Sequence, residues 1–282
     1  MKKIREPIWS YLSLSDKFDK SRIEKSPLDK VRASDAMDVN TFSELVKYIA
    51  YISYRNPDYA LFFRAQLRDY QTDDGKSSLY PSIYRGLSKE SPRALTLKYR
   101  FEILKRAEDA LLNEFRNNRF LGGSKLEKFR EMRWAILQHY CVCRTPLLDI
   151  THSLRVACSF AMNYMTDDSY LFVLGVPHPH GGISYSVEEE LLNIRLLSIC
   201  PPKAIRPYFQ EGFLIGSFPT SEKTRDLQLD VARRLIAKFC LKRATFMDRN
   251  FKPILNKTLF PEDDAVKSIC ERIKHGVVGE ES

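Results

Sequence analysis

The sequence predicts an α+β fold in which a single domain combines a mixed or antiparallel sheet with several flanking helices. Short runs rich in aromatic and branched apolar residues, such as 59–66 and 170–176, have the length and composition of buried strands. Longer stretches, such as 41–52, repeat apolar residues at the period of a helix. No internal repeat, low-complexity segment or clear linker divides the 282 residues, so we expect one domain.

The composition is that of an ordinary globular protein with a basic surface. Hydrophobic residues make up 44% of the chain, enough for a sizeable core. A formal net charge of +9 permits binding to nucleic acid or another polyanion, although no run of Lys or Arg concentrates the charge. No stretch of 18 apolar residues occurs, and the basic N-terminus is not followed by an apolar segment. We therefore expect no membrane partner and a cytoplasmic location.

The first forty residues are polar and contain few apolar repeats. They predict an N-terminal extension over 1–40, followed by an α+β domain over 41–282. Within that domain the core motifs span 59–217, and a C-terminal helical part spans 221–282.

A helix is predicted to begin near Thr41, with Asn40 or Thr41 as its N-cap, and to end before Pro57. The apolar run 59–66 that follows predicts a buried strand, on which Arg64 and Gln66 share one face. An arginine on a buried strand is costly to place unless it meets an anion or an acid. A salt bridge to a core carboxylate and a contact with a ligand are equally compatible with the pattern.

Three helical regions and their caps follow. Ser91-Pro92 is a typical start for a long helix that Gly122-Gly123 interrupts. A second helix is expected over 126–140 and a third over 153–165, with Asp149, Thr151 or Ser153 as caps. The segment between Tyr140 and Ser153 therefore predicts a helix–turn–helix arrangement.

The second half of the chain predicts further strands and helices. The run 170–176 indicates a buried strand, and 191–199 is ambiguous between helix and strand. Arg206, Gln210 and Glu211 directly precede Gly212 and a new apolar strand. The remaining expectations are an amphipathic helix over 222–241, a short strand over 242–247, and a last helix starting at Leu259 with Pro261 in its first turn.

Reactive side chains are concentrated between Leu137 and Ala161. This density indicates a functional site, and caps together with a satisfied buried polar pair are the structural alternative. Cys141 and Cys143 beside His139 have poor spacing for zinc, so we expect no metal. A Cys–His pair for nucleophilic hydrolysis is a further alternative, although residues two apart need not face each other.

Several motifs together resemble the FRG domain family, which is found in bacteria and in phage-related loci. The Phe-Arg-Gly motif that names the family stands here as Phe63-Arg64-Ala65, and a Pro-Ser-Leu-x-Arg segment as Pro81-Ser-Ile-Tyr-Arg85. The strongest match is Gln138-His-Tyr140 followed by Thr145 to Thr151 and Ser153 to Ala161, and a further motif of the family appears at Arg206 to Phe213. Ala65 in place of glycine excludes a backbone that needs a positive φ there.

The resemblance implies a distant likeness to ADP-ribosyltransferase folds, in which a strand arginine holds a phosphate of NAD. The function expected on this basis is ADP-ribose transfer from NAD to a protein or nucleic-acid acceptor, as a phage-defence or toxin-like effector. NAD is the expected cofactor. The resemblance implies catalytic roles for Arg64, His139, Tyr140, Asp149, Gln210 and Glu211, and cofactor contacts from Arg64, Gln66, Tyr84, Arg85, Thr145 and Thr151. Glu189 and Glu190 are alternatives to Glu211 for the carboxylate near the reacting carbon.

A binding module without chemistry is the alternative function. Arg64, Arg85, Arg144 and Arg206 and the net positive charge are also compatible with a pocket that recognises a nucleotide or a nucleic-acid end. Such binding would be sensitive to salt.

Overall fold

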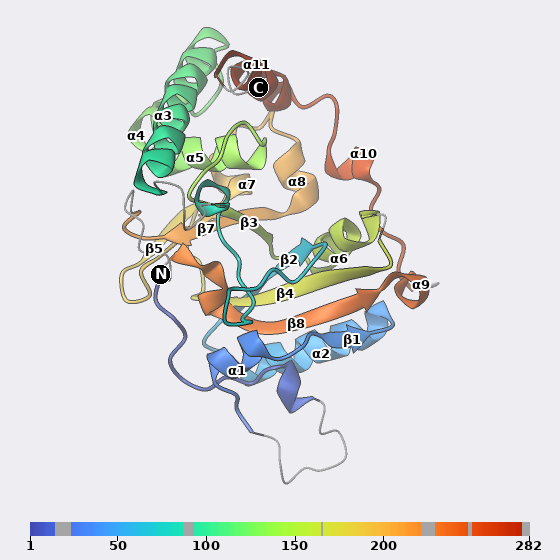
Figure 1. Cartoon of the computed structure of the whole chain (residues 1–282). Helices are drawn as coiled ribbons and strands as arrows, with labels where there is room; N and C mark the ends of the chain where they lie inside the picture. The colour runs from blue at the N-terminus through green and yellow to red at the C-terminus, as the bar shows by residue number, and fades with distance from the viewer. Residues whose placement is uncertain (15–23, 87–92, 165, 221–228, 248–249, 278–282) are drawn as a thin grey trace.

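Eight strands of the described chain form one mixed sheet in the computed structural model (Figure 1). The structure describes residues 1–14, 24–86, 93–164, 166–220, 229–247 and 250–277. The strand order is β1-β8-β4-β2-β3-β7-β6-β5; β1 pairs with β8 in parallel and the other neighbours are antiparallel. The strands are β1 Met37–Val39, β2 Ala60–Gln66, β3 Leu148–Thr151, β4 Asp168–Val176, β5 Ile183–Ser186, β6 Leu191–Arg195, β7 Gly212–Ser217 and β8 Leu235–Lys242.

Helices cover the sheet on two sides, which confirms the predicted α+β class. In Figure 1, α3, α4, α5 and α11 gather on one side of the molecule, and α1 and α2 lie beside β1 and β8 on the other. The helices of the described chain are α1 Leu28–Ala33, α2 Phe42–Arg55, α3 Arg93–Asn117, α4 Gly123–Lys128, α5 Arg130–His139, α6 Leu154–Asn163, α7 Leu196–Ile199, α8 Arg206–Gln210, α9 Arg243–Phe246, α10 Asn256–Leu259 and α11 Ala265–Val277. In the described residues, no helix is both long and apolar enough to cross a membrane.

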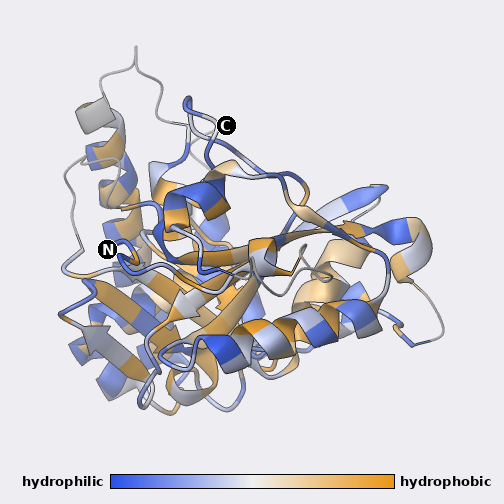
Figure 2. Cartoon of the chain, turned by 90° about the horizontal axis from the view of Figure 1, so that it is seen from below, coloured by the Kyte–Doolittle hydropathy of each residue, from blue (hydrophilic) through white to orange (hydrophobic). Residues whose placement is uncertain are grey.

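The buried apolar residues of the described chain form two hydrophobic cores. One packs α1, α2 and α6 against β8, β4 and β2, and the other packs α3, α5 and α11 against β6 and β7. Hydrophobic residues accordingly concentrate on the strands in Figure 2, whereas the helices also carry hydrophilic residues. Described residues of the predicted N-terminal extension contribute to the first core through Ile4, Ile8, Val31 and Val39. Strand β1 adds an edge strand to the sheet.

The prediction of a helix over 222–241 is wrong, because 235–242 form strand β8 between β1 and β4. Both faces of β8 are covered, so all but the last of its residues are buried and they lack the alternation that marks a half-exposed strand. In the sequence, Lys238 looks like a residue of a polar helix face. In the structure it is fully buried, with its Nζ 2.8 Å from Asp69 Oδ2. Residues 221–228 of that predicted helix lie outside the described residues. The strand predicted over 242–247 is also wrong, since 243–246 form helix α9.

Three other boundaries differ from the predictions. The helix expected over 126–140 is interrupted at Phe129, whose extended backbone (φ −112°, ψ 105°) separates α4 from α5. The last helix starts at Ala265 rather than Leu259, with the Asp264 carboxylate accepting hydrogen bonds from the amides of Val266 and Lys267. The ambiguous run 191–199 contains both kinds of structure, strand β6 followed by helix α7. The Ser91 cap falls outside the described residues.

The helix–turn–helix reading of the central segment is wrong as well. Residues 148–151 form strand β3, which lies in the sheet between β2 and β7. Of the three proposed caps, Ser153 is the N-cap of α6, and its hydroxyl accepts from Val156 N at 3.4 Å. Asp149 is therefore free of a capping role and is positioned by the sheet.

Helix α2 begins at the predicted cap, and this cap gives a stability test. Thr41 Oγ1 accepts from Glu44 N at 3.1 Å, and the Glu44 carboxylate accepts from Asn40 N at 3.3 Å. We expect Thr41→Ala to lower the free energy of unfolding by about 1 kcal/mol, because an amide of the first turn loses its acceptor. Thr41→Ser, which keeps the hydroxyl, should retain most of the free energy of unfolding. Urea denaturation of the three proteins measures the difference, and equal midpoints for Thr41→Ala and wild type would contradict the capping role.

Candidate functional site

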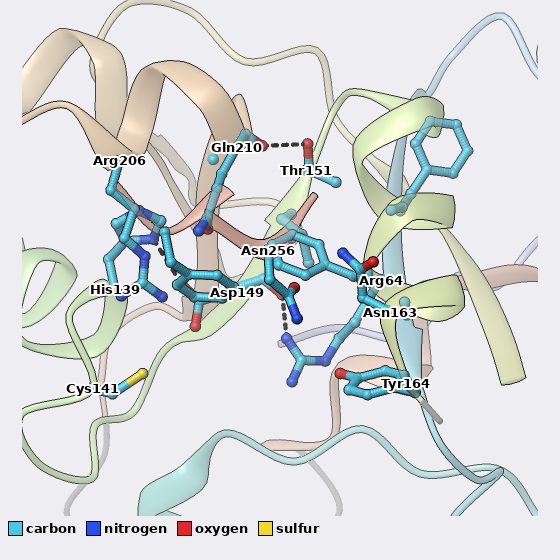
Figure 3. Close-up of a pocket in the computed structure, with 17 residues that line it drawn as sticks. Arg64, His139, Cys141, Asp149, Thr151, Asn163, Tyr164, Arg206, Gln210 and Asn256 are labelled. Carbon is cyan, nitrogen blue, oxygen red and sulfur yellow. Dashed lines mark hydrogen bonds and ion pairs between the residues drawn. The ribbon is translucent and has the colours of Figure 1, made fainter. Parts of the chain in front are cut away.

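The sheet opens between β2 and β3, and a pocket occupies the opening. These strands share one registered pair, Phe63 with Thr151, whereas β2 pairs with β4 along its full length. The pocket has a volume of about 400 Å³, and Figure 3 shows the side chains that line it. It is lined by Phe63, Arg64, Ala65, His139, Cys141, Asp149, Ile150, Thr151, Ala157, Phe160, Asn163, Tyr164, Arg206, Gln210, Gly212, Asn256 and Phe260.

Arg64 bridges the two strands at the point where their backbone pairing ends. Its Nη1 donates to the main-chain carbonyl of Asp149. Its Nε is buried without a partner, and Nη2 makes no hydrogen bond to a described residue. Burial lowers the pKa of Arg64, and the nearby Asp149 charge opposes this shift. No carboxylate of the described chain lies within ion-pair distance of this guanidinium, so unsatisfied donors remain for a ligand.

Asp149 carries a negative charge into the pocket. Its Oδ1 lies 3.3 Å from His139 Nδ1, and its Oδ2 accepts from Gln138 Nε2 at 2.7 Å. Burial alone would raise the pKa of Asp149, but the hydrogen bonds from His139 and Gln138 and the charge of Arg64 lower it to about 2. The side chain is 35% exposed, so the carboxylate is both ionised and accessible from the pocket.

His139 contacts the carboxylate of Asp149 through its Nδ1 atom. The imidazole is only 2% exposed, and its burial lowers its pKa, so the ring is neutral at pH 7. A neutral ring beside an ionised acid donates through Nδ1–H, and Nε2 has no partner among the described residues. Gly212 passes close to the ring, and a Cβ built there would lie 3.3 Å from His139 Cε1 and 2.7 Å from Leu196 Cδ1. A side chain at position 212 would therefore clash with Leu196 and press against the imidazole.

Arg206 supplies a second cation with unused donors. Its guanidinium carbon lies 4.6 Å from the ring centroid of Phe260 and 5.6 Å from that of Tyr140. Its Nε is buried without a partner, and no hydrogen bond joins its guanidinium to a described residue. The backbone is fixed instead, because Arg206 N donates to Asp264 Oδ2 at 2.8 Å. The two aromatic rings hold the cation without neutralising it.

Gln210 and Thr151 join helix α8 to strand β3 across the pocket. Thr151 Oγ1 donates to the carbonyl of Gln210 at 2.8 Å, and Gln210 Nε2 donates to the carbonyl of Leu259 at 2.7 Å. Both side chains are therefore occupied by structural hydrogen bonds although they line the pocket. Their bonds fix the distance between the helix that carries Arg206 and the strand that carries Asp149.

The structure brings five of the predicted site residues into the pocket: Arg64, His139, Asp149, Thr151 and Gln210. The others lie outside its lining. Tyr140 turns to the second core, where its hydroxyl donates to Asp264 Oδ2 at 2.7 Å. Thr145 contacts Gln138 instead, since its Oγ1 donates a hydrogen bond to Gln138 Oε1 at 2.6 Å.

Four more of the predicted site residues lie outside the pocket lining: Gln66, Tyr84, Arg85 and Glu211. Gln66 ends β2 opposite Tyr170, and Tyr84 is buried in the second core. Arg85 Nε donates to the Tyr80 carbonyl at 2.7 Å. Glu211 is exposed and has left-handed backbone (φ 43°) as the C-cap of α8. The other two glutamate candidates are also remote, because Glu189 pairs with Arg234 and Glu190 with the N-terminal amine.

The sequence reasoning did not assign Gln138, Asn163 or Tyr164 to the site, and it named Arg206 only for the alternative binding module. Gln138 and Arg206 carried a signal, because both belong to motifs that were recognised around His139 and Gln210. Asn163 and Tyr164 reach the pocket from the end of α6, and a polar pair after an apolar helix is too common a pattern to indicate a site. Cys141 lines the pocket with a positive φ of 55°, and among the described residues no group of His, Cys, Asp and Glu is suited to a metal ion.

The electrostatics of His139 can be tested by titration. Burial and the charge of Arg206 lower its pKa, whereas the Asp149 hydrogen bond raises it. We expect the His139 signal in an NMR pH titration, assigned by its loss in His139→Gln, to have a midpoint below the ordinary histidine value. Arg206→Gln should move that midpoint to higher pH, and Asp149→Asn to lower pH. A midpoint that is unchanged in both variants would contradict the described contacts.

Comparison with known proteins identifies a family for the central part of the chain. The family model of the FRG domain matches residues 78–169, which include α5, β3 and α6 and thus the Asp149–His139 pair. Strand β2 with Arg64 and helix α8 with Arg206 lie outside the matched residues. No curated protein and no solved structure matches the chain. The predicted resemblance is confirmed over this segment, and the chain contains an FRG domain.

Proposed function

We propose that the pocket binds NAD and that the protein transfers ADP-ribose from it to an acceptor. The observation that carries the proposal is the pair of arginines, Arg64 and Arg206, which line one pocket with guanidinium donors that no described residue uses. Unused donors on a buried cation are unfavourable until an anion accepts them. A phosphate, with its several acceptor oxygens, is the group that arginine binds best.

The pocket walls suit a ligand that joins phosphate to an aromatic ring. Phe160, Tyr164 and Phe260 provide apolar surface beside the two arginines. The volume of about 400 Å³ falls within the usual size of a small-molecule site, and accommodates a ring, a ribose and a phosphate. In this proposal one half of the dinucleotide occupies the pocket and the other half extends from its mouth.

Asp149 is the residue that we assign to the chemistry. In the reaction the glycosidic bond of NAD breaks, and nicotinamide leaves with the bonding electron pair. The acceptor's nucleophilic atom forms the new bond to the ribose carbon and releases its proton to water. Positive charge develops on the ribose during this exchange, and an ionised carboxylate stabilises it. Among the described lining residues Asp149 has that charge, and so takes the role that the family resemblance suggested for a glutamate.

Binding without chemistry is the second candidate, and one observation favours it. None of the described residues that line the pocket is a glutamate, and Glu211, Glu189 and Glu190 all lie elsewhere. A pocket that only recognises a nucleotide needs Arg64 and Arg206 but does not need Asp149 to be ionised.

The deciding experiment is incubation of the protein with NAD labelled on its adenylate phosphate, together with single-stranded DNA, RNA and protein acceptors. We expect release of nicotinamide and transfer of label to one acceptor class. Arg64→Ala should abolish both signals, whereas Arg195→Ala, which removes an exposed arginine at the end of β6, should leave them unchanged. Intact NAD with every acceptor, in a protein that binds NAD, would favour the binding module. An effector role in phage defence or as a toxin is a separate part of this proposal, which the transfer experiment alone does not test.

A further inference from the structure

A chain of hydrogen bonds leads from the loop before β3 to the carboxylate of Asp149. Leu147 N donates to Thr145 Oγ1 at 3.3 Å, and Thr145 Oγ1 donates to Gln138 Oε1 at 2.6 Å. Gln138 Nε2 then donates to Asp149 Oδ2 at 2.7 Å. A second hydroxyl, Ser82 Oγ, lies 3.2 Å from Gln138 Oε1. The Gln138 amide therefore links Asp149 to two hydroxyl groups that lie outside the pocket lining.

The carboxylate at the end of this chain allows only one orientation of the Gln138 amide. An ionised carboxylate accepts hydrogen bonds and donates none, so the amide must turn its nitrogen toward Asp149. The amide oxygen is then turned toward Thr145, whose hydroxyl donates to it. A flipped amide would place its oxygen against the carboxylate and lose both bonds. The donors of the chain therefore all point in one direction, toward Asp149.

The backbone that carries Gln138 is fixed by the end of helix α5. Cys141 N donates to the Gln138 carbonyl at 3.0 Å, and Cys141 has a left-handed backbone (φ 55°). Val142 N donates to the Leu137 carbonyl at 2.9 Å. These two bonds and the left-handed residue form a Schellman motif, a common end of helices. Gln138 and the adjacent His139 therefore leave the helix from a backbone whose last carbonyls are satisfied.

Thr145 is held in place independently of Gln138. Its side chain is fully buried, and its amide donates to Ser82 Oγ at 3.0 Å. Its carbonyl accepts from Ile83 N at 3.2 Å. The main chain of Thr145 is thus bonded on both sides to the turn at 82–84, and its hydroxyl is presented to Gln138 from a fixed position.

We propose that Gln138 is a positioning residue for the transfer reaction: its amide nitrogen holds the Asp149 carboxylate, and the hydroxyls of Thr145 and Ser82 fix the orientation of the amide. His139 and Gln138 contact different oxygens of the carboxylate, so the two side chains together set its plane. A carboxylate fixed in this way meets the charge that develops on the ribose without first having to reorganise.

The part of Gln138 in transfer rests on the proposed function. Its hold on Asp149 does not, because the hydrogen bonds of the chain require no NAD. Two measurements separate these two statements, one made without NAD and one made during turnover.

The first measurement is an NMR pH titration of the Asp149 carboxyl carbon without NAD, assigned by loss of the signal in Asp149→Asn. Gln138→Leu removes the donor, and Thr145→Val removes the hydroxyl that orients it. Both should move the midpoint to higher pH, because a hydrogen bond to the ionised form favours that form. Thr145→Ser, which keeps the hydroxyl, should bring the midpoint back. Thr245→Val makes the same change on the exposed surface of α9 and should not move it.

The second measurement is nicotinamide release as a function of pH. Gln138→Leu should lower kcat by roughly 10–100-fold, the loss that corresponds to one hydrogen bond to a charged group. The affinity for NAD should stay within a few-fold of the wild type, since Arg64 and Arg206 are unchanged. The acidic limb of the kcat profile should move to higher pH, in step with the Asp149 midpoint. Thr145→Val should show a smaller loss that Thr145→Ser recovers.

Two results would overturn the proposal. The first is an unchanged Asp149 midpoint in both Gln138→Leu and Thr145→Val, in proteins whose circular dichroism matches the wild type. The second is a loss of turnover that leaves the acidic limb in place, or that Thr145→Ser does not recover, which would indicate a structural role alone. Shifted midpoints in a protein that releases no nicotinamide would support the hold of Gln138 on Asp149 and contradict the transferase function.

Discussion

Arg64→Ala is expected to weaken the binding of NAD by roughly 100-fold. Each hydrogen bond between a guanidinium and a charged acceptor contributes about 1.5–3 kcal/mol, and Arg64 has two nitrogens available for such bonds. The substitution also leaves the Asp149 carbonyl without its donor, so local order between β2 and β3 should decrease. Isothermal titration calorimetry measures the change in affinity.

Two control variants separate the loss of donors from loss of the fold. Arg64→Lys keeps the charge but not the fork of donors, and should recover only part of the affinity. Arg195→Ala removes an exposed arginine outside the pocket and should bind NAD as the wild type does. Circular dichroism should show an unchanged secondary structure in all three. Wild-type affinity in a folded Arg64→Ala protein would contradict the assignment of the phosphate to this residue.

Asp149→Asn is expected to lower the rate of NAD turnover by about 10²–10⁴-fold, with NAD affinity within a few-fold of the wild type. The amide has the shape of the carboxylate but lacks the charge that stabilises a developing cation. Its oxygen can still accept from Gln138, and the neutral ring of His139 can change tautomer to accept from the amide nitrogen.

The rate constant should therefore fall while the Michaelis constant changes little. Nicotinamide release at saturating NAD measures the former, and calorimetry with the same protein measures the affinity. Gln138→Glu is a useful companion, because it places a second acid beside the carboxylate and removes the donor. Full turnover by Asp149→Asn would exclude the carboxylate from the reaction.

The parts of the fold that were predictable are those with a clear local pattern. Helix α2 with its Thr41 cap, and strands β2 and β4, were predicted to within two residues, because their apolar spacing and flanking residues agree with the final environment. Strand β8 was not, since a strand buried on both faces has no period, and the buried Lys238 depends on Asp69 at a distant position in the chain.

The sequence pointed to some of the residues that line the pocket but not to the shape of the pocket. Arg64 and Asp149 stand out as polar groups next to apolar runs, which made both of them candidates from the sequence. That Arg64 bonds the Asp149 carbonyl follows from the opening between β2 and β3, and strand separation leaves no local signature. Tyr140 and Glu211 adjoin pocket residues in the chain yet face other surroundings, because neighbours on a helix point in different directions.

The central claim is that the pocket between β2 and β3 holds a nucleotide phosphate on Arg64 and Arg206. A crystal structure of the protein soaked with NAD tests it most directly. We expect phosphate oxygens within roughly 3 Å of guanidinium nitrogens of both arginines, and the nicotinamide ribose beside Asp149. Density for NAD elsewhere on the protein, with both guanidinium groups still lacking an acceptor, would contradict the proposed site.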